Sequence, residues 1–180
     1  MEFTEVLKNR RSIRKFKSEK ISHDLLKEIA ENAGYAPSWK NSQTARYFFI
    51  DNDDVKNQIA ENCTMGFEHN RDIIKNAPVL AVLAIASGRS GFERDGSFTT
   101  SKGDRWEMFD SGIAAQTLCL SAYEKGIGTC IMGIFDDKKV AETIKLPENL
   151  KAGALIVMGI PDENPSAPKR KSTDETVSFI

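Results

Sequence analysis

The chain is poor in the residues that build disulfides and metal sites. It has three cysteines, Cys63, Cys119 and Cys130, no CxxC pair, and two histidines, His23 and His69. Three scattered cysteines are too few for a disulfide framework. Neither histidine has a partner at the spacing of a zinc site, so no metal is expected. The sequence therefore predicts a reduced, metal-free protein of the cytoplasm.

The chain also lacks long apolar runs and a dominant charge. No apolar run approaches the ~18 residues that a membrane-spanning helix needs. The amino terminus carries Glu2, Glu5 and Lys8 where a secretory leader would have its apolar core. The net charge is only -1 and the sequence pI is about 6.2, whereas a general nucleic-acid binder normally has a broad basic surface. Neither a membrane nor a nucleic acid is expected as a partner.

The sequence does contain enough apolar residues for a sizeable core. Of its 180 residues, 40% are hydrophobic and 28% charged, which suits one domain over residues 1–180. Helical periodicity and capping residues predict helices at 3–9, 23–33, 53–62, 105–125 and 136–145. Apolar or aromatic runs predict strands at 46–50, 78–86, 128–132 and 152–160. Interleaved strands and helices indicate a layered α/β or α+β domain.

Two segments in the middle of the chain are unusual. Residues 87–104 are rich in glycine and hydroxyl residues, and a stretch of this kind inside a domain is usually a functional or disordered loop. The helix expected over 105–125 is apolar nearly all round, which is typical of a buried helix. Because 180 residues offer little else to cover such a helix, we expect a second copy of the chain to cover part of it.

The segment GIGTCIMG at 126–133 resembles a nucleotide-binding loop only superficially. A phosphate loop needs Lys and then Ser or Thr after the last glycine, but Ile134 and Phe135 follow. Ile131 stands where a dinucleotide fingerprint needs its third glycine. A tight turn before a buried strand explains the first two glycines. Gly133, at the strand's end, could instead present a bare backbone N–H to a ligand.

Two basic clusters lie near opposite ends of the chain. NRRSIRKF at 9–16 places Arg10, Arg11 and Arg14 around Ser12, and APKRKS at 167–172 places three cations in a row. A charge run is most often a solvated face. Arginine beside a hydroxyl is also the usual equipment for a phosphate oxygen, and a phosphate monoester carries about -1.5 to -2 charges. The alternatives are two solvated faces or two clusters that converge on one phosphate.

The polar loop at 36–45 allows two interpretations. Asn41, Ser42 and Gln43 suit plain turn chemistry, but they could also offer amide donors and acceptors to a heterocycle. Trp39 lies beside them, and it and Trp106 are more often packing residues than cofactor contacts.

Four segments, in this order, resemble the FMN-dependent nitroreductase family. They are RRSIRKF at 10–16, APSWKNSQ at 36–43, FDSGIAAQTLCLSAYEKGIGTCIMGIFD at 109–136, and ALIVMGIPDENPSAPKRKSTDETV at 154–177. The resemblance implies an α+β fold, a three-layer α-β-α sandwich with a mixed central sheet, in a domain-exchanged homodimer. It also implies FMN at the dimer interface and electron transfer from NADH or NADPH to nitroaromatics, quinones or similar small acceptors.

The resemblance also implies which residues contact the flavin. The phosphate, ribityl chain and pyrimidine edge would be held by the first basic cluster, the isoalloxazine by the partner's 36–43 loop and by the end of the strand at 128–132, and the phosphate again by the second cluster. These residues are Arg10, Arg11, Ser12 and Arg14; Pro37, Ser38 and Asn41; Met132 and Gly133; and Lys169, Arg170 and Lys171.

Two of these residues would act on the flavin's chemistry, which the cofactor itself supplies. Reduction places negative charge near flavin N1 and the C2 carbonyl, where Arg14 is the candidate cation. Hydride enters and leaves at N5, where the Gly133 backbone N–H is the candidate donor. No protein nucleophile or general base is needed.

The sequence departs from the family pattern in the 36–45 loop. The family often has Pro-Trp after the glutamine, whereas Thr44 and Ala45 follow Gln43 here, and Trp39 stands where a small residue is usual. These departures concern the substrate more than the flavin. The rival hypothesis is a non-catalytic FMN store or sensor, and a weaker one is a scaffold whose basic ends bind acidic partners.

Overall fold

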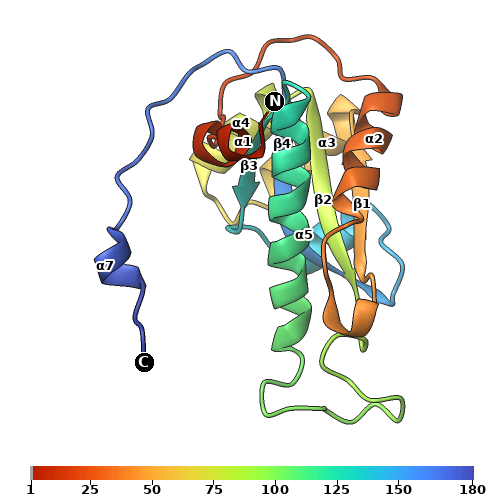
Figure 1. Ribbon diagram of the computed structural model, residues 1–180. Helices are drawn as coiled ribbons and strands as arrows, with labels where there is room; N and C mark the ends of the chain where they lie inside the picture. The colour runs from red at the N-terminus through yellow and green to blue at the C-terminus, as the bar shows by residue number, and fades with distance from the viewer. Residues whose placement is uncertain (1) are drawn as a thin grey trace.

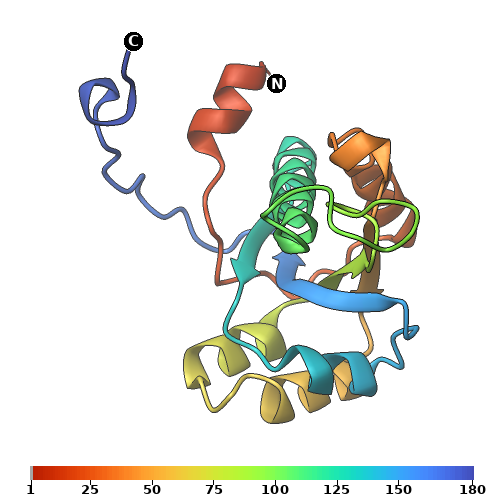
Figure 2. The ribbon, with the colours of Figure 1, turned by 90° about the horizontal axis from the view of Figure 1, so that it is seen from below.

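The computed structural model describes residues 2–180 and stacks its helices on both faces of one sheet (Figure 2). The elements are α1 (Phe3–Asn9), α2 (His23–Ala33), the 3-10 helix η1 (Trp39–Asn41), β1 (Ala45–Ile50), α3 (Asp53–Asn62), α4 (Glu68–Asn76), β2 (Val79–Ala86), α5 (Arg105–Glu124), β3 (Gly128–Met132), α6 (Asp137–Thr143), β4 (Leu150–Gly159) and α7 (Thr173–Thr176). The predicted α-β-α sandwich is confirmed, as are the predicted strands and helices, within a residue or two at their ends.

The sheet has the order β1-β2-β4-β3, and each neighbouring pair is antiparallel. The expected mixed sheet is therefore wrong for the four strands of the described chain. The one parallel pairing among the described residues is an isolated bridge between Ser12 and Thr129. The long apolar run of β2 suggested burial on both faces, which is common in parallel sheets. Here it reflects a helical layer on each face of an antiparallel sheet.

The side chains of β2 alternate between two cores. Ala81 and Leu83 face one core with α2 and α5, while Leu80 and Val82 face the other with α3, α4 and α6. Side chains of a strand point alternately to its two faces, so an unbroken apolar sequence serves both layers. Figure 2 shows the two helical layers on either side of the sheet.

Capping residues start the helices where the sequence predicts. Ser22 accepts a hydrogen bond from the Leu25 N–H at 3.2 Å, and Asp136 accepts one from the Lys139 N–H at 3.1 Å. Each satisfies one N–H group that has no partner inside its helix.

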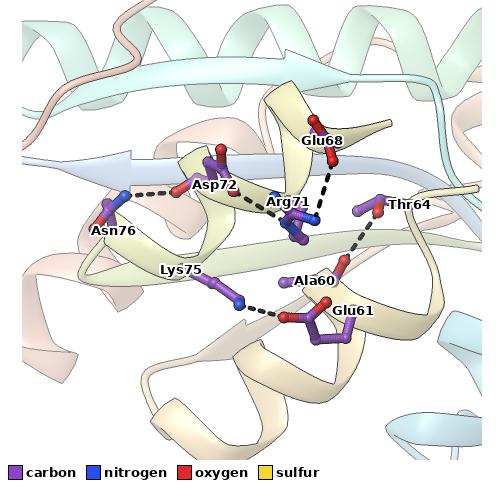
Figure 3. Close-up of polar contacts among 8 residues, drawn as sticks. All are labelled: Ala60, Glu61, Thr64, Glu68, Arg71, Asp72, Lys75 and Asn76. Carbon is purple, nitrogen blue, oxygen red and sulfur yellow. Dashed lines mark hydrogen bonds and ion pairs between the residues drawn. The ribbon is translucent and has the colours of Figure 1, made fainter. Parts of the chain in front are cut away.

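The sequence analysis missed α4. Its sequence, EHNRDIIKN, is polar, and only Ile73 and Ile74 mark a buried side. Figure 3 shows how polar contacts serve the rest of the helix: Lys75 pairs with Glu61 of α3, and Arg71 pairs with Glu68 and Asp72. Two isoleucines over nine residues give too weak a period to predict a helix from pattern alone.

The helix α5 buries its apolar residues along its second half, but at its start the apolar residues are exposed and the acidic residues are buried. Leu118 and Cys119 are at most 1% exposed, as expected of a buried helix, whereas Met108 and Phe109 are 56% and 58% exposed. The acidic residues Glu107 and Asp110 lie inside instead. Within one chain the helix is therefore buried only beyond its first two turns, and the expected cover of the rest by a second copy stays a prediction.

The two ends of the chain stand away from the sheet. The tail after β4 runs beside α1 on one side of the molecule and ends beyond α7 (Figures 1 and 2). Phe3 and Leu7 of α1 and Val177 and Phe179 of the tail are exposed. No helix within residues 2–180 is long and apolar enough to cross a membrane.

Candidate functional site

A hollow of about 280 Å³ lies between the amino-terminal segment and the tail. Its lining comes from both ends of the chain: Arg10, Arg11, Ser12, Arg14, Pro165, Ser166, Pro168 and Arg170. The structure thus brings the first basic cluster together with Arg170 of the second. Lys169 and Lys171 are not among the residues that line the hollow.

Backbone pairing holds the two ends together beneath the hollow. Lys17 donates its N–H to the Ile160 carbonyl at 2.9 Å, and Asp162 donates its N–H to the Lys15 carbonyl at 3.0 Å. A single oxygen of Glu163, Oε1, accepts the Arg14 N–H at 2.5 Å and the Lys15 N–H at 3.2 Å. Glu163 therefore joins the start of the tail to the first basic cluster.

The cations around the hollow lack acidic partners. Arg11 donates from Nη1 to the Lys8 and Arg10 carbonyls at 2.6 and 2.8 Å. Within residues 2–180, no carboxylate forms an ion pair with the side chain of Arg10, Arg11, Arg14 or Arg170. Like charges gathered in this way repel one another unless an anion joins them. The guanidinium forks and the Ser12 hydroxyl suit a phosphate dianion.

The strand β3 leads from this hollow to Gly133. The start of β3 contacts the basic segment, because Ile13 donates its N–H to the Thr129 carbonyl at 2.9 Å. A strand rises about 3.3 Å per residue, so Gly133 lies about 13 Å farther along the same edge. A Cβ added at Gly133 would meet no atom within 4 Å, and its N–H has no backbone acceptor among the described residues. Gly133 thus offers an open donor, while Met132 before it is buried.

Pro37, Ser38 and Asn41 lie elsewhere in the chain. They belong to the turn beside the amino-terminal end of α5, at the far end of the molecule from α1 (Figure 1). Pro37 and Ser38 line a separate cavity of about 120 Å³ together with Tyr47 and Asp110. Within one chain the structure does not unite these residues with the basic hollow. Their predicted role on the partner's flavin stays a prediction.

The remaining nucleophiles near these cavities are held in their neutral forms. Burial raises the pKa of Tyr47 to about 12, and its hydroxyl donates to the Ala114 carbonyl at 3.4 Å. Burial also raises the pKa of the Cys130 thiol, although Arg14 nearby opposes the shift. These groups cannot serve as bases or thiolate nucleophiles near neutral pH.

The sequence analysis missed two acidic residues of the site. Glu163 gives no local signal, because its partners lie 148 and 149 residues away. Asp110 does give one. With Glu107 it forms an acidic pair at i, i+3 in an otherwise apolar helix, and buried acids in such a setting are normally hydrogen-bonded to something specific.

A model of the nitroreductase family matches residues 7–160. The chain belongs to the nitroreductase family. An oxygen-insensitive NADPH nitroreductase of Helicobacter acinonychis (strain Sheeba) is 26% identical, over 98% of this chain and 95% of the relative. A nitroreductase family protein from Clostridium novyi NT has 32% sequence identity and a TM-score of 0.77, over 97% of this chain and 91% of that one.

A third match names a cofactor. An FMN-dependent nitroreductase from Clostridium difficile R20291 is 26% identical with a TM-score of 0.76, over 98% of each chain. The resemblance on which the sequence analysis relied is therefore confirmed at the level of family and fold. The basic hollow and the Gly133 edge are the nitroreductase's candidate cofactor site.

Proposed function

We propose that this nitroreductase is an FMN-containing oxidoreductase. In this proposal it passes electrons from NADH or NADPH to nitroaromatics, quinones or similar small acceptors. The observation that carries the proposal is the hollow lined by Arg10, Arg11, Arg14 and Arg170 with the Ser12 hydroxyl, whose cations lack acidic partners in residues 2–180. The FMN dependence named for the Clostridium difficile R20291 relative supports it.

The basic lining of the hollow would hold the FMN phosphate, and Lys169 and Lys171 would add positive charge from the tail. Each charge-assisted hydrogen bond contributes roughly 1.5–3 kcal/mol. Arg14 would place a fixed cation near flavin N1 and O2, which favours the negatively charged reduced form. Met132 would pack beside the ring.

Bound FMN would supply the redox chemistry between the nicotinamide and the acceptor. The chain's own task is then to bind, orient and leave access. The Gly133 N–H is free to donate to flavin N5, and the space above it lets a donor or an acceptor approach. Ile131 and Ile134 on either side are 46% and 49% exposed, so the approach to this edge has apolar walls that suit a planar aromatic molecule.

The proposal includes a homodimer. Pro37, Ser38 and Asn41 lie too far along the molecule to join the hollow of their own chain, so a second copy would supply them. The exposed apolar residues Met108 and Phe109 would be covered in the same interface. Light scattering of the FMN-loaded protein is expected to give twice the mass of one chain. The cytoplasmic location stays a prediction from the sequence.

Anaerobic reduction is the experiment that decides between an enzyme and an FMN store. The protein is loaded with FMN, freed of excess cofactor and mixed with NADH or NADPH in the absence of oxygen. Loss of the visible flavin absorbance is expected with at least one donor, followed by its return when a quinone or nitroaromatic is added. Absorbance that persists with both donors would leave storage or sensing as the function. A chain that never retains FMN would contradict the proposal altogether.

A further inference from the structure

The turn at residues 38–43 has an unfavourable backbone. Lys40, Asn41 and Gln43 have φ values of 47°, 54° and 47°, in the left-handed region that residues other than glycine rarely adopt. Residues of this kind persist only where surrounding contacts hold them, and they gather at functional sites. Three of them within four positions require a strong set of contacts.

Part of that set lies within the turn. Gln43 donates its N–H to Ser38 Oγ at 2.9 Å, and Asn41 donates its N–H to the Ser38 carbonyl at 3.0 Å. These bonds give the turn its shape. They do not place it on the rest of the molecule.

A buried carboxylate places it. Asp110 Oδ2 accepts the Trp39 N–H at 2.9 Å and the Ser90 hydroxyl at 2.5 Å. Ser90 Oγ also lies 3.2 Å from Ser42 Oγ. One oxygen on α5 therefore holds the start of the turn directly and its end through Ser90. Asp110 is 5% exposed and Ser90 is fully buried, so water offers little competition for these bonds.

The loop at 87–104 closes over the same turn. Lys40 Nζ of the turn lies 3.2 Å from Glu93 Oε1 of the loop. On the α5 side, the rings of Trp39 and Trp106 have centroids 4.9 Å apart. Ser90 belongs to this loop, so the loop, the turn and α5 meet at the Asp110 carboxylate. The long glycine-rich loop thus has a structural task at one definite point.

Glu107 provides a built-in comparison. It lies one helical turn before Asp110 and is 3% exposed. It accepts the Gly88 N–H at 2.6 Å and the Lys151 ammonium at 3.2 Å. Glu107 therefore anchors the same loop to α5 and to the sheet, but makes no hydrogen bond to the turn.

We propose that Asp110 is a positioning residue for the flavin site. It holds the strained 38–43 turn on α5 so that Ser38 and Asn41 are presented in a fixed geometry to the FMN of the partner protomer. The inference rests on the proposed function, because it takes the turn to be a flavin contact. A strained turn held in advance of binding loses less freedom when the ligand arrives.

The first measurement needs no cofactor. Amide hydrogen exchange of residues 39–43 is compared among the wild type, Asp110→Ala, Asp110→Asn and Glu107→Ala. We expect Asp110→Ala to speed exchange at least tenfold. Asparagine keeps an oxygen that can accept both bonds, so Asp110→Asn is expected to retain most of the protection. Glu107→Ala is expected to leave the turn protected. Unchanged exchange in Asp110→Ala, or equal acceleration in Glu107→Ala, would overturn the inference.

The second measurement concerns the ligand. Affinities for FMN and for riboflavin, which has no phosphate, are compared in the same proteins. Asp110→Ala is expected to weaken both at least tenfold while their ratio stays that of the wild type, because the basic hollow is untouched. Unchanged flavin affinity with a loosened turn would show that the turn does not touch the flavin, and would overturn the positioning role.

Failure of the proposed function has a different signature. A wild type that binds no FMN contradicts the flavin site itself, while exchange still decides whether Asp110 holds the turn. If Asp110→Ala does not fold, Ser90→Ala removes the link to Ser42 and leaves the carboxylate in place. It is expected to speed exchange at residues 42 and 43, and unchanged exchange there would count against the clamp.

Discussion

The basic hollow and the 38–43 turn are held in place by different forces. Around the hollow, cations gather with no carboxylate partner among residues 2–180, and backbone pairing and Glu163 join the two chain ends. The turn, in contrast, is held by the buried Asp110 carboxylate of α5 and the buried Ser90 hydroxyl of the 87–104 loop. Within the described chain, the cations of the hollow lack an acidic counterpart, whereas the turn is strained and is held by hydrogen bonds within the protein.

The difference indicates two ways to prepare a binding site. Incomplete charge favours an anion strongly and depends on salt, because exposed charges are screened. A strained turn with satisfied hydrogen bonds supplies geometry, which limits what the bound molecule can do. We therefore expect mutations at the hollow to change how much FMN is bound. Mutations at the turn should weaken FMN and riboflavin alike, and mutations at Gly133 should change how the bound flavin reacts.

The largest effect is expected from reversing two charges that line the hollow. Arg10→Glu with Arg170→Glu removes two charge-assisted bonds of roughly 1.5–3 kcal/mol each, so FMN affinity should fall roughly a hundredfold to ten-thousandfold. The matched control is Lys169→Glu with Lys171→Glu, which makes the same change in net charge at residues outside the lining. This control should lower FMN affinity less than tenfold. Equal losses in fluorescence titrations of the two proteins would show that net charge matters and contact does not.

The next effect is expected at Gly133, in the rate and not in binding. Gly133→Pro deletes the backbone donor, and a preorganised donor can contribute roughly 2.7–4 kcal/mol to a transition state. Stopped-flow reduction of bound FMN should slow at least tenfold while FMN affinity changes little. Gly133→Ala keeps the N–H, and its Cβ meets open space, so its rate should stay close to that of the wild type. Similar rates in both variants would assign the N5 donor to another residue.

A moderate effect is expected at Glu163, where two contributions oppose each other. Removing its charge leaves the hollow more positive, which strengthens phosphate binding by roughly 1 kcal/mol at the dielectric constant of water. Removing its two charge-assisted bonds frees the Arg14 and Lys15 backbone, and each such bond is worth roughly 1.5–3 kcal/mol. Positioning should dominate, so Glu163→Ala is expected to weaken FMN about tenfold and lower the melting temperature. Glu163→Gln keeps an oxygen acceptor and should lose less. Tighter FMN binding in Glu163→Ala would reverse this ranking.

The smallest effect is expected at the exposed pair between Lys40 and Glu93. Hydrogen bonds from Thr99, the larger contribution, and from Lys40 hold the pKa of Glu93 below its usual range. A lowered folded pKa contributes stability above the unfolded pKa, and this is lost as pH falls through the folded value. Glu93→Gln should therefore shift the melting temperature equally at pH 6 and pH 8, with a difference that shrinks only in acid. Flavin affinity should change less than threefold, as for other exposed pairs.

The elements of the fold were largely predictable from local pattern. Apolar runs and capping residues such as Ser22 are local properties, so they survive whatever the rest of the chain does. The misses have a shared cause. The polar helix α4 takes one of its ion pairs from the neighbouring α3. The exposed Phe109 beside the buried Asp110 reverses the usual preference, because the acid finds hydrogen-bond donors 20 and 71 residues away.

The sequence by itself determined which charges and strands this protein has, and through four ordered motifs it indicated the nitroreductase family. Only the tertiary structure decided that Arg170 lines the hollow while Lys169 and Lys171 do not, and that Glu163 joins the two ends. It also decided that Asp110 holds a strained turn. The physical reason is that hydrophobic period and capping are written over neighbouring residues, whereas a hydrogen bond or a charged lining depends on residues that meet only after the sheet has formed.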